Sequence, residues 1–241
     1  MMNSKKSAYL HTSEIIQIAD GIVKQYYGKR TPQKVDVDAI AVKVLKQNVI
    51  YESIAEANPN QLGFTADGKT PLCVWRDRKV TKVVFQAGTI VLDRYLLRPD
   101  MELRRRFVLA HELSHTILAR TDPLHHAACF HTEQINVENS PLEQLRPCMA
   151  FSELQANTMA GSILLTSDAL KQTVKKVFGT EKINSYGKRL FLPKDVEKLY
   201  RIAEAKGVSY TTLCIQLEAC DLLNVGRVED YLRLTGVANG S

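Results

Sequence analysis

The sequence has no hydrophobic run long enough to span a bilayer, and it contains only five cysteines. Residues 1–6 are not followed by the apolar core of a signal peptide. The cysteines are odd in number and include no Cys-x-x-Cys pair, which argues against a disulfide framework. We therefore expect a cytoplasmic protein with reduced thiols. Its 241 residues, 45% of them hydrophobic, are enough to bury a sizeable core.

The net charge of +6 raises the question of nucleic-acid binding. Lysine and arginine are spread along the chain, and their one tight cluster is residues 104–106. This cluster lies in a stretch with helical periodicity, where Arg104 shares the stripe of His111. We interpret the cluster as a solvated or ion-paired helix face, or as a support for the core, and not as a DNA-binding patch.

Residues 111–115 read His-Glu-Leu-Ser-His within an apolar, helix-periodic run. On a helix His111 and His115 lie one turn apart on the same face, so two imidazoles can bind one zinc ion. Glu112 stands beside them and can take a proton from zinc-bound water, whose pKa falls to about 7. The pattern predicts a zinc peptidase. The alternative is a pair of satisfied core histidines.

A catalytic zinc needs a third protein ligand, and Glu153 is the best candidate. It opens another stretch of helical periodicity, and Asn157 follows one turn later on the same face. Asn157 can accept a hydrogen bond from the free N–H of a zinc-bound histidine. Glu153 could instead be an ordinary surface acid, and other glutamates compete for the ligand role: Glu133, Glu138 and Glu143. Small residues after Glu153 are expected to let the two ligand helices approach closely: Ala156, Ala160 and Gly161.

Two segments together resemble the ImmA/IrrE metallopeptidases. Residues 105–115 read Arg-Arg-Phe-Val-Leu-Ala-His-Glu-Leu-Ser-His, and residues 153–157 read Glu-Leu-Gln-Ala-Asn, followed by Leu164 and Leu165. Residues 35–41 and 88–92 also fit, so the resemblance covers about residues 10–170. Met159 stands where the family usually has an aromatic residue, and Thr166 where it usually has proline.

The resemblance implies a cytoplasmic zinc protease that cleaves a helix-turn-helix repressor, releasing genes of a mobile element or a stress response. The implied metal ligands are His111, His115 and Glu153, with Glu112 as the general base. It also implies that one strand is an edge strand that pairs with the extended substrate. This strand consists of residues 89–92, which are Thr89, Ile90, Val91 and Leu92.

The expected mechanism is water-promoted peptide hydrolysis. Zinc polarises the scissile carbonyl, and Glu112 deprotonates the bound water and later passes the proton to the leaving amine. A second group should stabilise the oxyanion, and Tyr186, His126 and His131 all remain candidates. Cys129 lies close to histidines in sequence, but we interpret residues 120–150 as containing a solvated loop of unassigned role.

The expected fold is α+β and zincin-like, with a small, mostly antiparallel sheet, an active-site helix and a C-terminal helical module. We place a metallopeptidase domain at residues 1–180 and the module at 181–241. Helices are expected at residues 13–28 and from Asp36 or Asp38 to about 46. Strands are expected at 48–52, 62–65, 71–75, 80–85 and 89–92, with hairpin turns at residues 67–68 and 77–78.

Residues 195–206 and 210–223 are predicted helices joined by a turn at 207–209, as in a helix-turn-helix. Residues 210–218 contain no lysine or arginine to contact DNA, so we expect this module to brace the peptidase or bind its substrate. Two alternatives remain. One is a non-catalytic anti-repressor whose zinc is structural and recruits Cys148 or His131. The other is a transcription regulator that binds DNA through these helices.

Overall fold

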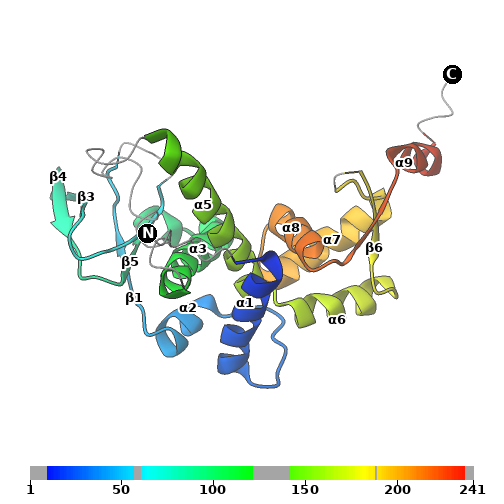
Figure 1. Cartoon of the computed structure of the whole chain (residues 1–241), viewed down its shortest axis with the longest axis horizontal. Helices are drawn as coiled ribbons and strands as arrows, with labels where there is room; N and C mark the ends of the chain where they lie inside the picture. The colour runs from blue at the N-terminus through cyan, green and yellow to red at the C-terminus, as the bar shows by residue number, and fades with distance from the viewer. Residues whose placement is uncertain (1–9, 57–60, 122–141, 188, 237–241) are drawn as a thin grey trace, which may run out of the picture.

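Two long helices, α3 (Glu102–Thr121) and α5 (Leu142–Leu164), pack against each other near the centre of the molecule (Figure 1). The computed structural model describes residues 10–56, 61–121, 142–187 and 189–236, with residues 121 and 142–150 described by their backbone alone. The architecture is α+β, as expected from the sequence. None of the described helices has the length and apolar composition needed to cross a bilayer.

Helix α1 (Thr12–Tyr27) packs along α5 and confirms the first predicted helix to within one residue. Its apolar residues recur at helical spacing, and their buried face includes Ile15, Ala19 and Val23. Asp36 caps the next helix, α2 (Val37–Ala39), by accepting a hydrogen bond from the Ala39 N–H at 2.9 Å. The chain then continues as a π-helical turn, η1 (Ile40–Val44), where we expected a regular helix.

The main sheet has the strand order β1 (Asn48–Glu52), β5 (Thr89–Asp93) and β2 (Gly63–Thr65). β1 runs parallel to β5, and β2 runs antiparallel to it. The expectation of a mostly antiparallel sheet is therefore wrong, because β5 returns between β1 and β2 and runs in the same direction as β1. The expectation that residues 89–92 form an edge strand is also wrong, since β5 is central and paired on both sides.

A separate hairpin of β3 (Pro71–Arg76) and β4 (Lys79–Val84) lies outside this sheet at one end of the molecule (Figure 1). Its two-residue turn is Asp77 and Arg78, both with positive φ (50° and 63°), and confirms the predicted turn. The turn at residues 67–68 does not join paired strands, because β2 and β3 belong to different sheets. Asp67 instead closes a loop by accepting hydrogen bonds from the N–H groups of Lys69 and Thr70.

The C-terminal part contains elements that the sequence did not predict. After α6 (Ser167–Phe178), the strand β6 (Ile183–Tyr186) pairs in parallel with β7 (Leu223–Gly226), and α9 (Val228–Thr235) follows. The predicted pair of helices is present as α7 (Pro193–Lys206) and α8 (Tyr210–Ala219), with Ser209 capping α8. α8 ends before residue 223 because the chain turns at Asp221, whose φ is positive.

The hydrophobic core is continuous across the predicted domain boundary at residue 180. Buried residues of α1, α3, α5, α7 and α8 belong to one cluster. We expected Gly161 to allow the close approach of α3, but it faces α8. A Cβ at Gly161 would lie 2.9 Å from Gln216 Oε1. Gln216 Nε2 donates to Ser162 Oγ at 2.8 Å in this buried contact. α8 is thus packed on α5. Its exposed residues are Thr211, Ile215 and Glu218, and none of them is a cation that could contact DNA.

Candidate metal centre

Helix α3 presents His111 and His115 one turn apart, with their Nε2 atoms 3.0 Å from each other. His115 is buried and His111 is partly buried, while the opposite side of α3 contributes Leu109 and Leu113 to the core. This is the arrangement that a four-residue spacing on a helix requires. The two imidazole nitrogens therefore converge on a single point.

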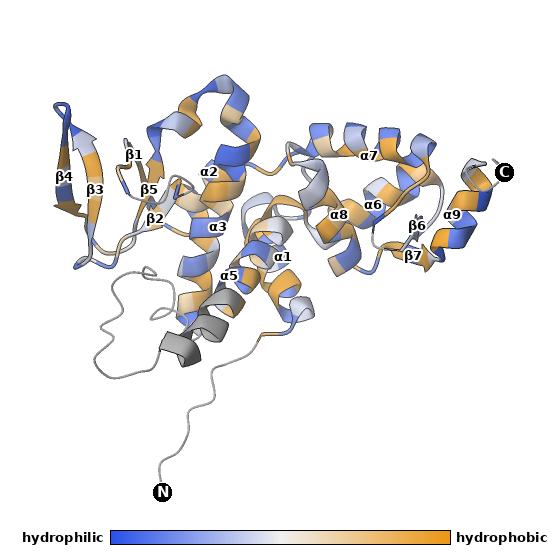
Figure 2. Ribbon diagram, turned by 90° about the horizontal axis from the view of Figure 1, so that it is seen from above, coloured by the Kyte–Doolittle hydropathy of each residue, from blue (hydrophilic) through white to orange (hydrophobic). Residues whose placement is uncertain are grey.

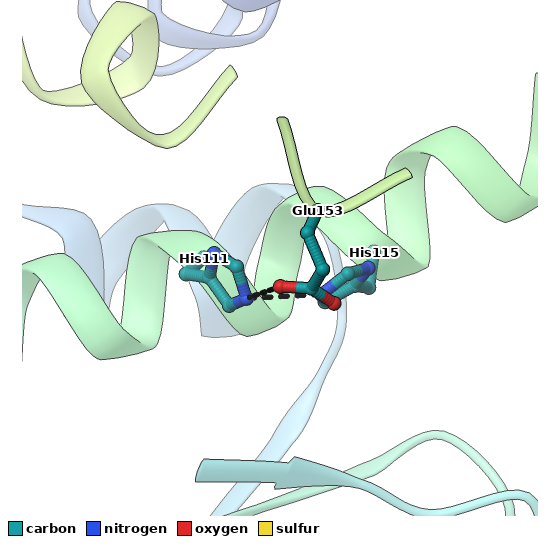
Figure 3. A group of neighbouring side chains, drawn as sticks. All are labelled: His111, His115 and Glu153. Atoms are coloured by element: carbon teal, nitrogen blue, oxygen red, sulfur yellow. Dashed lines mark hydrogen bonds and ion pairs between the residues drawn. The ribbon is translucent and has the colours of Figure 1, made fainter. Parts of the chain in front are cut away.

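Helix α5 brings the carboxylate of Glu153 to the same point (Figure 3). Its Oε2 lies 3.3 Å from His111 Nε2, and its Oε1 lies 3.3 Å from His115 Nε2. Burial raises the pKa of the Glu153 carboxyl, but hydrogen bonds from the two histidines outweigh that effect and hold this pKa well below its usual range. The carboxylate is therefore ionised, as a metal ligand must be.

The three side chains fit one divalent metal ion. Zinc binds nitrogen and oxygen ligands at about 2.0–2.2 Å, so ligand atoms at the corners of a tetrahedron lie about 3.3 Å apart. Here the two Nε2 atoms are 3.0 Å apart, and each lies 3.3 Å from a different oxygen of the Glu153 carboxylate. Two imidazoles and one carboxylate form a donor set used by catalytic metal sites that keep a fourth position open. The residues could thus hold a metal ion and a reactant together.

Asn157 orients one of these histidines. Its Oδ1 lies 3.0 Å from His111 Nδ1, one turn along α5 from Glu153, as predicted. The contact favours a proton on Nδ1, because an amide oxygen can only accept. With a metal ion bound, Nε2 of His111 would carry no proton and would be free to bind the metal.

The carboxylate of Glu112, the residue next to His111 in the chain, contacts the strand β2. Only 8% of the residue is exposed, and its Oε2 accepts a hydrogen bond of 2.7 Å from Thr65 Oγ1. Gly63 allows this approach, because a Cβ at that position would lie 2.5 Å from Glu112 Oε1. Sequence reasoning missed Gly63 and Thr65, since nothing in the local pattern shows that β2 lies against α3.

Several predicted site residues are not at this centre. The side chains of residues 89–92 are buried in the sheet and cannot contact a substrate. Tyr186 is excluded as the oxyanion-stabilising group, because β6 lies far from α3 in both views of the molecule (Figures 1 and 2). Other candidates lie outside the residues whose side chains are described: His126, Cys129, His131, Glu133, Glu138, Glu143 and Cys148.

In the arginine cluster on α3, Arg104 is exposed, Arg105 is ion-paired and Arg106 is buried, in agreement with its interpretation from the sequence. Arg105 makes two hydrogen bonds to the Asp38 carboxylate, at 2.6 and 2.9 Å, and a third to Tyr51. Arg106 is buried and donates to the carbonyl of Gly207, which follows α7, at 3.0 Å. Both arginines therefore fix the metal-site helix to its neighbours.

Comparisons with known proteins place few limits on the function. No family model matches the chain, and no curated protein matches it. Among solved structures, a Mycobacterium tuberculosis transcriptional regulator matches with 14% sequence identity and a TM-score of 0.44. The match covers 87% of this chain and 48% of the regulator, so this chain spans about half of that protein's length. The function must therefore be argued from the site.

Proposed function

We propose that the protein is a zinc-dependent endopeptidase similar to the ImmA/IrrE metallopeptidases. The observation that carries this proposal is the convergence of His111 and His115 with Glu153, whose carboxylate oxygens each lie 3.3 Å from a histidine Nε2. Glu112, the residue after His111 on the same helix, is buried and supplies a carboxylate that can act as a base. Residues 105–115 and 153–165 carry the sequence resemblance, and these are the segments that build the centre.

The chemistry divides between the metal and the chain's own residues. His111, His115 and Glu153 would hold a zinc ion, which would lower the pKa of a bound water to about 7 and polarise a carbonyl. Glu112 takes the proton from the attacking water and delivers it to the leaving amine. Thr65 holds one oxygen of the Glu112 carboxylate, so the orientation of the base is fixed before substrate arrives.

The strand β2 takes the substrate-binding role that the sequence resemblance assigned to residues 89–92. It is an edge strand of the three-stranded sheet, and Thr65 within it contacts Glu112. An extended peptide that pairs with β2 would pass beside the base. The substrate class follows from the resemblance alone: a helix-turn-helix repressor, whose gene we expect nearby.

The test is cleavage of that repressor by the zinc-loaded protein, read by intact mass. The wild type should make one discrete cut, and Glu112→Gln should bind zinc but make none, because an amide cannot accept the proton. His115→Ala should lose both zinc and activity. A stable complex without cleavage by the zinc-loaded wild type would contradict the peptidase and favour a sequestering anti-repressor. Normal cleavage by Glu112→Gln would show that the base is misassigned.

A further inference from the structure

The two faces of the β3–β4 hairpin differ in burial. Residues that face each other across the hairpin point to the same side, which separates the pairs into two sets. Leu72 and Val74 point inward and form a small core with Phe64 and Val91 of the sheet. The outward set contains the pairs Pro71 with Val84, Cys73 with Lys82, and Trp75 with Val80. The inward face therefore attaches the hairpin to the sheet, and the outward face is not needed for this attachment.

The outward face is apolar and exposed. Trp75, Val80 and Val84 are 52%, 51% and 53% exposed. Trp75 and Val80 are direct cross-strand partners, and Val84 lies on the same face further along β4. Figures 1 and 2 place β4 at the outer end of the molecule, beyond the three-stranded sheet. An exposed tryptophan beside an exposed valine, with a second exposed valine on the same face, is typical of the apolar anchors in protein interfaces.

Positive charge lies on this face and next to it. Lys82 lies between Val80 and Val84 on the outward face, and Arg78 lies in the adjoining turn. Both are exposed, and the described residues give neither of them an ion pair. Arg76 is different because it pairs with Glu52 at 2.5 Å. Asp77 is the only acid within residues 71–84. The surface therefore carries positive charge at Lys82 and next to it at Arg78, and a complementary partner is acidic.

We propose that the outward face of the hairpin, defined by Trp75, Val80, Lys82 and Val84, docks an acidic protein segment that carries apolar side chains. Nucleic acid fits this face less well, because Trp75 is its single stacking surface, and Val80 and Val84 offer neither stacking nor a phosphate contact. Exposed apolar side chains with a lysine between them can bind apolar and acidic side chains of one protein segment. The proposal concerns binding only, so it holds whether or not the chain cleaves its partner.

The only tryptophan of the chain, Trp75, reports on this surface directly. The probe is a short synthetic peptide in which glutamate alternates with leucine and phenylalanine, titrated into the full chain carrying Glu112→Gln. We expect a saturable blue shift of the Trp75 emission that weakens as salt is added. A peptide with glutamine in place of glutamate should bind about tenfold more weakly or worse. The absence of a shift with the acidic peptide would overturn the proposal.

Matched variants distinguish binding at this surface from non-specific electrostatic attraction of the peptide to a basic protein. Arg78→Glu with Lys82→Glu should weaken binding about tenfold or more, and Val80→Thr with Val84→Thr should also weaken it. The control is Lys175→Glu with Lys176→Glu on the exposed side of α6, which makes the same charge change elsewhere and should leave the affinity unchanged. Equal losses in the control, or tighter binding of a single-stranded oligonucleotide than of the peptide, would overturn the proposal. Thermal unfolding of each variant verifies its fold.

Discussion

Thr65 of β2 donates a hydrogen bond to Glu112 of α3, with 2.7 Å between Oγ1 and Oε2. Hydrogen bonds to charged groups contribute about 1.5–3 kcal/mol. Thr65→Ala should therefore reduce kcat for repressor cleavage by about tenfold or more, since 1.4 kcal/mol is one factor of ten. KM and zinc content should not change, because Thr65 contacts the base and none of the metal ligands.

Thr65→Ser is the matched control for this prediction. Serine keeps the hydroxyl and should restore most of kcat, whereas Thr65→Val keeps the shape and should behave like alanine. Steady-state kinetics and zinc analysis of the three variants check the assignment. Equal kcat in the serine and valine variants would show that the hydroxyl does not position Glu112.

Zinc should stabilise the folded chain, because the three ligands converge only in the native state. A zinc concentration about a hundredfold above Kd contributes about 2.7 kcal/mol, or a rise in Tm of about 5–10 °C for a chain of this size. Glu112→Gln should keep the shift, and His115→Ala and Glu153→Ala should lose it. Differential scanning calorimetry with and without a chelator measures the effect. A similar rise in the His115→Ala variant would place the metal elsewhere.

Asn157 should tune metal affinity without being a ligand. Its Oδ1 fixes the proton of His111 on Nδ1, and loss of such a partner typically costs about 10–100-fold in metal affinity. We expect that loss from Asn157→Leu, measured by competition with a chromogenic chelator. Thr158→Val on the next position of α5, whose hydroxyl bonds only to Leu154 O, is the control and should bind zinc normally. Unchanged affinity in Asn157→Leu would rule out the orienting role.

Substitution by alanine should have opposite effects on stability at two glycines. At Gly63 a Cβ would lie 2.5 Å from Glu112 Oε1, so Gly63→Ala should displace the base and lower activity and Tm. At Gly21, inside α1, nothing lies within 4 Å, and Gly21→Ala should stabilise the protein by up to about 1 kcal/mol. Unfolding curves of both variants test the pair. A Gly63→Ala variant with full activity would mean that β2 does not approach Glu112 so closely.

Cys220 should react slowly with alkylating agents while the protein is folded. Burial raises the pKa of its thiol from 9.0 to about 11. The thiolate is the reactive form, so at pH 8 its fraction falls about a hundredfold relative to the unfolded chain. The same shift favours the folded state at pH values below 9, and this contribution is lost as the pH rises through 11. Iodoacetamide labelling with peptide mass spectrometry measures both states, and equal rates in both would contradict the shift.

The sequence determined the features that depend on residues close together in the chain. The four-residue spacing places His111 and His115 on one face of a helix, and the same spacing places Glu153 beside Asn157. The turn at Asp77 and Arg78 and the caps Asp36 and Ser209 are also local, so they could be predicted. The limits of α1 and of the five strands β1 to β5 followed within one or two residues from hydrophobic periodicity.

The tertiary structure alone decided which segments meet. Sequence patterns could not show that β5 is central and β2 is at the edge, because strand order depends on how a long connection returns to the sheet. For the same reason Gly63 and Thr65 could not be assigned to Glu112, and the pairing of β6 with β7 was missed. Glu153 had sequence competitors, and only the packing of α5 on α3 brings its carboxylate to the histidines. Distant segments come into contact because they bury their apolar faces together. Hydrophobic periodicity identifies the apolar face of each segment, but it does not show which two faces pack against each other.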